Sequence, residues 1–100
     1  MSSTLLLSND LAGGLRMATS RLATGQVTVV LLDRAAASAR PGSSDAAAVT
    51  TAITAGVTVA AHDDALRRRG IQQVVDGIQV VDLDRVADLL TGGADQVAWL

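Results

Sequence analysis

Apolar and polar positions alternate along the chain in blocks that predict strands and helices in turn. Apolar residues recur at a spacing of three or four at Leu11, Leu15, Ala18 and Leu22, which is typical of a helix with one buried face. Short apolar runs separate this helix from later ones. They predict strands at residues 4–7, 26–32, 57–61, 78–81 and 96–100.

Polar residues and glycines indicate where each predicted helix begins and ends. The polar runs at residues 8–10, 43–45, 62–64 and 82–84 precede helices and offer side chains that can cap their first amides. The helices end at Gly25, Gly56, Gly70 and Gly92. After the second strand, an Ala-rich stretch at 35–39 leads into the breaker at 40–42, and residues 71–77 form a connector of undefined structure.

The order of these elements predicts the fold class. Residues 26–32 form a continuous, nearly all apolar run rich in β-branched residues, as expected for a strand that is covered on both faces. Strict alternation of strands and helices favours parallel pairing. We therefore predict an α/β, three-layer fold, with a five-stranded, mostly parallel sheet and helices on both faces, in a single domain over residues 1–100.

Composition excludes several classes of function. The chain of 100 residues has no cysteine, no lysine, a net charge of −2 and one aromatic residue, Trp99. Disulfides, thiolate metal sites and cysteine nucleophiles are excluded, and direct binding to nucleic acid is not expected. No apolar run approaches the roughly 20 residues that span a bilayer, and the first residues do not resemble a signal peptide, so we expect no membrane association and a cytoplasmic location.

Polar side chains follow the predicted strands, at the edge where open α/β sheets bind ligands. We take Asp33, Arg34 and His62 as a candidate pocket because they follow the second and third strands. His62 can bind an anion or shuttle a proton, or it can simply be a polar residue at a helix start. Since it is the only histidine, a multi-histidine metal site is excluded.

No catalytic constellation emerges from these residues. Asp10, Asp33 and Asp82 are a conceivable Mg²⁺ site of the phospho-acceptor type, but the chain lacks the lysine that such a site needs. It also lacks a phosphate-binding glycine motif, which disfavours nucleotides. The sequence therefore predicts neither a metal nor a cofactor, and no enzyme activity.

Two features are candidates for an interface. Arg67 and Arg68 belong to the only basic run, which either complements the helix dipole or holds an acidic partner. Trp99 lies in an apolar terminus that can pack in its own sheet or against another subunit.

The second half of the chain also resembles a known family. The segments VTVAAHDDALRRRG (57–70), IQVVDLD (78–84) and ADQVAW (94–99) are similar to the DsrH/TusB family of the DsrE/DsrF/DsrH sulfur-relay superfamily. The terminal Gln-x-Ala-Trp is the most distinctive element. The first half agrees more loosely and departs at Asp33-Arg34-Ala35, where the family commonly has Asp-Gly-Val.

The resemblance implies a five-stranded parallel sheet and a hetero-hexamer with DsrE/TusD-like and DsrF/TusC-like subunits. The persulfide is carried by a cysteine of the DsrE/TusD subunit, at the start of the helix after the third strand. Here His62 occupies that position. The resemblance thus implies a non-catalytic accessory subunit that most closely matches TusB, which supports sulfur transfer to the tRNA wobble uridine to give 2-thiouridine.

Three alternatives remain open at this point. The chain can be a DsrH-type subunit of sulfur oxidation, or a stand-alone homo-oligomeric binding module, which the Asp33-Arg34 departure favours. A small enzyme using His62 with Asp33 as acid and base is the third.

Overall fold

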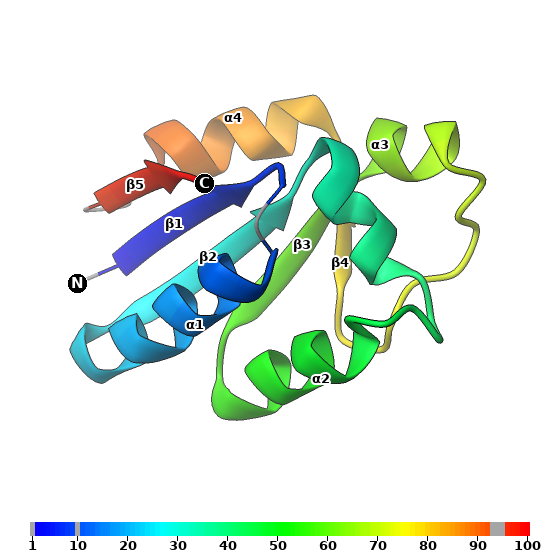
Figure 1. The fold of residues 1–100 in the computed structure, drawn as a ribbon. Helices are drawn as coiled ribbons and strands as arrows, with labels where there is room; N and C mark the ends of the chain where they lie inside the picture. Colours follow the sequence, from blue (N-terminus) through cyan, green and yellow to red (C-terminus); the bar gives the residue numbers. More distant parts are fainter. Residues whose placement is uncertain (1, 10, 93–95) are drawn as a thin grey trace.

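A computed structural model describes residues 2–9, 11–92 and 96–100 (Figure 1). Five strands form one sheet in the order β4-β3-β2-β1-β5, and all four pairings are parallel. The strands are β1 (Ser2–Leu7), β2 (Gln26–Leu31), β3 (Thr58–His62), β4 (Gln79–Val81) and β5 (Gln96–Trp99). The helices are α1 (Leu11–Arg21), α2 (Ala46–Ala55), α3 (Asp63–Arg68) and α4 (Leu83–Thr91), with 3₁₀ segments η1 (Leu22–Thr24) and η2 (Asp33–Ala39). The predicted fold class is confirmed.

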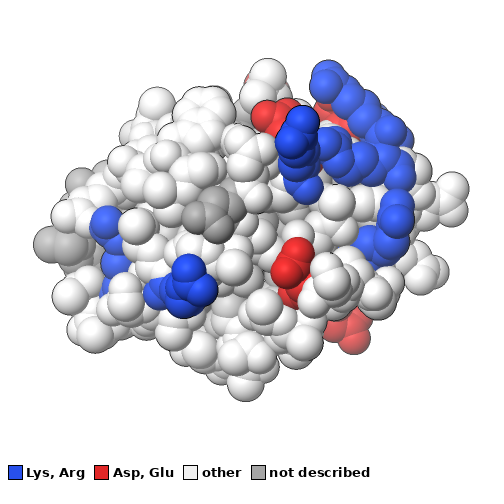
Figure 2. Space-filling view, viewed as in Figure 1, with Lys and Arg blue, Asp and Glu red and all other residues white. Residues whose placement is uncertain are grey.

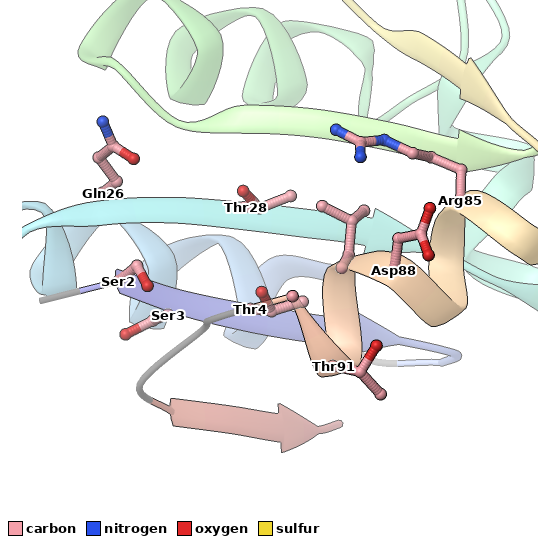
Figure 3. A pocket seen from close by; sticks show the side chains of 10 residues that line it. Ser2, Ser3, Thr4, Gln26, Thr28, Arg85, Asp88 and Thr91 are labelled. Carbon is pink, nitrogen blue, oxygen red and sulfur yellow. The ribbon is translucent and has the colours of Figure 1, made fainter.

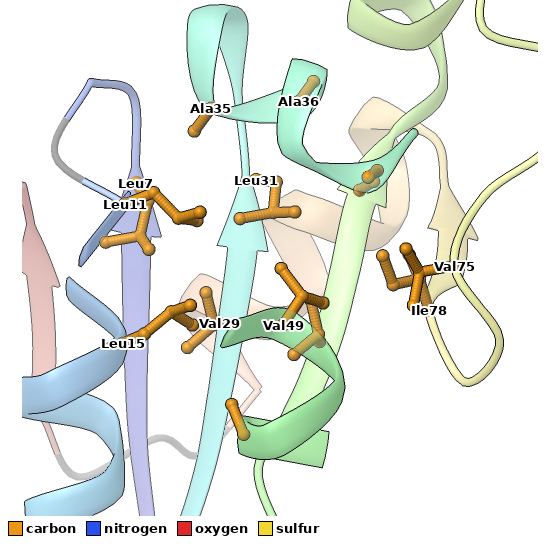
Figure 4. Packing of buried hydrophobic residues seen from close by; sticks show 14 of the residues in the cluster. Leu7, Leu11, Leu15, Val29, Leu31, Ala35, Ala36, Val49, Val75 and Ile78 are labelled. Atoms are coloured by element: carbon orange, nitrogen blue, oxygen red, sulfur yellow. The ribbon is translucent and has the colours of Figure 1, made fainter. Parts of the chain in front are cut away.

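The sheet separates two apolar clusters, because alternate residues of each strand point to opposite faces. On one face, Leu7, Val29 and Leu31 pack against α1, α2 and η2 (Figure 4). On the other face, Leu6, Val30, Ala60 and Val81 contact Val86 of α4. Figure 1 shows α1 and α2 on the near side of the sheet and α4 on the far side, which completes the three layers.

The connector that the sequence left undefined has no helix or strand, yet it is firmly packed. Ile71, Val75 and Ile78 are buried in the larger cluster, and the Val75 amide donates to the Ala39 carbonyl at 2.8 Å. Ile78 forms part of this packing, and its amide donates to the Val75 carbonyl in a turn. Because Ile78 belongs to that turn, β4 begins at Gln79, one residue later than predicted.

The helix caps differ from the sequence expectation in two places. The carboxylate of Asp82 accepts from the Arg85 amide at 2.8 Å and caps α4 as predicted. Asp45 precedes α2 but makes no side-chain cap; its Oδ2 instead accepts from the Ser38 hydroxyl at 3.3 Å. His62 precedes α3 and does not cap it either. Position before a helix therefore did not determine which polar side chains cap it.

Within the described residues, no helix combines the length and apolar character needed to cross a membrane.

Candidate functional site

The carboxyl ends of the strands meet at one edge of the sheet, as predicted from parallel pairing. Ser8 follows β1, Asp33 comes shortly after β2, His62 ends β3 and Asp82 follows β4. Because β2 and β3 are neighbours, Asp33 and His62 come from adjacent strand ends. In Figure 1, η2 and α3 both begin at this edge.

The turn after β2 places its unusual backbone at Asp33. Asp33 has φ +47°, and no other non-glycine residue of the described ranges has a positive φ. The Ala35 amide donates to the carbonyls of Ser8 and Leu32, both at 3.0 Å, and so joins this turn to the loop after β1. Arg34 occupies the position where the resembled family has glycine, but the left-handed residue here is Asp33, so an arginine fits without strain.

Arg34 faces a small polar cavity of about 210 Å³. Asn9, Ser38 and Asp45 line the same cavity, and all lie on the side of the sheet that carries η2 and α2. A guanidinium beside an amide, a hydroxyl and a carboxylate can bind small polar groups. Of the three predicted pocket residues, only Arg34 lines this cavity.

His62 is directed away from that cavity. His62 is paired in register with Val81, which belongs to the apolar cluster under α4, and it lies two positions after Ala60 of the same cluster. Its side chain therefore points to the α4 face of the sheet. Its side chain is 20 % exposed, and Nε2 lies 3.8 Å from Oδ1 of Asp63, which is too long for a hydrogen bond. In the described ranges no hydrogen bond or ion pair joins His62 to Asp33. The acid–base pairing of these two residues therefore stays a prediction that no contact in the described residues supports.

Acidic and imidazole side chains do not gather into a metal site within the described part of the chain, where no group of three occurs. Asp33 and Asp82 follow β2 and β4, which are separated by β3. Asp10, the third member of the conceivable Mg²⁺ site, lies outside the described residues.

The basic run at the end of α3 is partly neutralised by its own helix. Asp64 pairs with Arg67 at 3.5 Å and with Arg68 at 2.7 Å. Arg69 donates to the Ala65 carbonyl, and Arg40 donates to the carbonyl of Arg69. Figure 2 shows the resulting concentration of basic side chains at one end of the molecule, near α3. Arg67 and Arg68 thus pair with Asp64 of their own helix, and because they are exposed they also present a basic surface.

β5 forms an open edge of the sheet. The Leu100 amide donates to the Leu6 carbonyl of β1, and the Leu100 carbonyl accepts from the amide of Ser8, which follows β1, at 2.8 Å each. Because bonding alternates along a parallel strand, the main-chain groups of Val97 and Trp99 point outward. Their side chains are also exposed, by 47 % and 67 %. Trp99 is held in place by a 2.7 Å hydrogen bond from Nε1 to the Ser8 hydroxyl.

The opposite edge carries the other exposed large apolar side chains of the described residues, Val80 of β4 and Leu83 at the start of α4. Neither was predicted from the sequence as an interface residue. The sequence did offer one indication of this edge: a short strand, β4, is followed directly by the cap of α4.

Known structures share this architecture. No protein-family model and no curated protein matches the sequence. The crystal structure of YchN from E. coli superposes with a TM-score of 0.84 over 100 % of both chains at 19 % identity. The chain has the YchN fold. A protein of unknown function from Methanobacterium thermoautotrophicum follows, with a TM-score of 0.77, 17 % identity and 97 % of each chain covered. A conserved protein of unknown function from Bacteroides thetaiotaomicron gives 0.78 and 15 %, over 97 % of this chain and 93 % of that one.

The similarity to YchN concerns the fold alone. At these sequence identities, the role of a residue in YchN cannot be transferred to a residue of this chain. The function must therefore be argued from this chain's own residues: the sequence has no cysteine, and apolar side chains are exposed on both edge strands.

Proposed function

We propose that this chain is a non-catalytic subunit of a sulfur-relay complex, in which a partner of the DsrE/TusD type carries the persulfide. The proposal combines the sequence resemblance to DsrH/TusB with the YchN fold. The observation that carries it is the open β5 edge, where Val97 and Trp99 expose both side chains and main-chain groups.

An unpaired strand edge presents free main-chain donors and acceptors, which another chain can pair with. Natural proteins usually protect such edges with charges, proline or a bulge. The described strand β5, Gln96–Trp99, has no charged residue and no proline. Another chain can therefore add a strand there through main-chain hydrogen bonds, with Trp99 and Val97 supplying apolar contact.

The role that follows is structural support. The helix start after β3 carries His62, whose imidazole has no sulfur to form a persulfide. Sulfur would pass through the partner's cysteine, in the cytoplasm, toward 2-thiouridine in tRNA. The basic surface at Arg67 and Arg68 is available for an acidic region of a partner such as a DsrF/TusC-like subunit.

Co-purification from the source cells tests the proposal. Tagged wild-type chain should recover a cysteine-bearing subunit in stoichiometric amount. The variant Val97→Pro removes one outward N–H and leaves the bonds to β1, so it should lose most of that partner while keeping its own fold. Val97→Ala retains the N–H and is the matched control, which should keep the partner. Recovery of the tagged chain only with copies of itself would support the homo-oligomeric module instead.

A further inference from the structure

A second and larger cavity lies away from the carboxyl edge, under α4 and beside the first halves of β1 and β2. It has a volume of about 600 Å³. Figure 3 shows Thr4, Gln26 and Thr28 directed from the strands toward a space that Arg85, Asp88 and Thr91 of α4 border. Its size is within the range of small-molecule sites.

The sheet under this cavity is polar where an inner sheet is ordinarily apolar. Central strands of a parallel sheet, covered by helices on both faces, are expected to be apolar throughout. Here Ser2 lies beside Gln26, and Thr4 lies beside Thr28. By strand alternation these four side chains share the α4 face with Leu6, which packs under the helix. Four neighbouring polar positions on the same face indicate more than chance exposure.

Five polar side chains that line this cavity lack a protein partner within the described residues, whereas the Thr91 hydroxyl donates to the Ala87 carbonyl. Over residues 2–9, 11–92 and 96–100, no hydrogen bond or ion pair involves the side chains of Thr4, Gln26, Thr28, Arg85 or Asp88. Thr4 is only 3 % exposed, and no buried side-chain oxygen or nitrogen of the described residues lacks a partner, so the Thr4 hydroxyl meets water through this cavity. A ligand hydroxyl can replace that water as its hydrogen-bond partner. The cavity therefore holds hydrogen-bonding capacity that the fold does not use.

We propose that this cavity binds an uncharged polyhydroxylated molecule of monosaccharide size. Arg85 and Asp88 are one helical turn apart and of opposite charge, so the site has no net charge and a simple anion or cation would meet a like charge. A guanidinium donates and a carboxylate accepts, so together they match the hydroxyl groups of a diol. The threonine hydroxyls and the Gln26 amide do both, which suits a ligand made of hydroxyl groups.

Titration of the full-length protein with myo-inositol, D-ribose and D-glucose tests this site, with inorganic phosphate as the charged comparison. Backbone amide shifts are followed by ¹H–¹⁵N correlation spectra. At least one of the three polyols should produce saturable shifts at Thr4, Thr28 and Asp88. The isosteric variant Thr4→Val should weaken that binding at least fivefold. Thr51→Val is the matched control on α2, across the sheet, and should leave it unchanged.

A second readout does not depend on the ligand. Thr4→Val keeps the shape and the β-branch of the side chain, so the amide spectrum of the free variant should be that of the folded protein, with shifts confined to residues around the cavity, while its polyol binding is weakened. The proposal is overturned if no polyol shifts these amides at 100 mM, or if phosphate alone does. Equal binding by wild type and Thr4→Val would contradict it as well.

Discussion

At the scale of single residues, the turn at Asp33 decides how the edge of the sheet is built. A left-handed backbone costs an ordinary residue about 1–2 kcal/mol, and aspartate tolerates it better than most. Asp33 at φ +47° therefore lets Arg34 keep an ordinary conformation and face the small cavity beside Asn9.

This turn makes a prediction about stability. Asp33→Val places a β-branched residue at a positive φ and should lower the free energy of unfolding by about 1–2 kcal/mol. Asp33→Gly should change it by less than about 0.5 kcal/mol, since glycine adopts this backbone freely. Chemical denaturation measures both. Arg34→Val is the neighbouring control and should also change little; a loss as large as that of Asp33→Val would mean that the effect is not backbone strain.

The sequence did not predict the direction of the side chains at the strand ends. Asp33 and His62 were expected to lie together because they follow strands that were predicted to be neighbours. In the structure, β2 and β3 do pair with each other. No hydrogen bond or ion pair of the described residues joins the two side chains, and because β3 extends through His62, strand parity turns that imidazole toward α4. A shift of one residue in a strand end reverses the face, and sequence patterns do not fix ends that closely.

At the scale of elements, the contact between α1 and β1 depends on a glycine. A Cβ atom at Gly14 would lie 2.3 Å from Leu7 Cδ2 and 2.6 Å from Leu7 Cδ1. Leu7 is fully buried in the larger cluster and has little room to move. Gly14 therefore lets the first helix lie directly on the first strand.

Gly14→Ala should destabilise the protein by about 1 kcal/mol in denaturant unfolding. Alanine favours a helix over glycine by about 1 kcal/mol, but overpacking a tight core costs about 1–3 kcal/mol. In a Leu7→Ala background the clash is absent, so the same substitution should become stabilising. If Gly14→Ala has the same effect in both backgrounds, the close contact with Leu7 does not determine the residue at this position.

Elements with periodic or continuous apolar patterns were predictable, and the irregular ones were not. The strands at 26–32 and 57–61 and the helix that begins at Leu11 follow directly from such patterns. The connector at 71–77 has no periodicity, because separate elements position its buried residues: the Ile71 amide donates to Leu66 of α3, and the Val75 amide donates to Ala39 of η2. Long-range contacts of this kind leave no local signal in the sequence.

At the scale of the whole molecule, the sheet has two faces of different character and two open edges. One face is apolar along β2 and along β1 after Ser3, while the α4 face is polar in the first halves of both strands. The polar residues Thr4, Gln26 and Thr28 were visible in the sequence. Gln26 and Thr28 are two positions apart in a strand predicted to be buried on both faces, so they lie on the same face, and this was the indication of a polar cavity. The edges at Val80 and Trp99 could be located only once the strand order was known.

These features support a molecule that works as part of an assembly. Exposed apolar side chains occur on both edge strands, Val80 on β4 and Val97 and Trp99 on β5. Pairing at the β5 edge would extend the sheet into another subunit and cover Trp99, which is 67 % exposed in the isolated chain.

The most direct test is the native mass spectrum of the complex recovered with this chain from its own cells. The account predicts a hetero-oligomer that contains a cysteine-bearing subunit of the DsrE/TusD type, with a reducible extra sulfur on that cysteine. A spectrum that shows only monomers or homo-oligomers of this chain would contradict it.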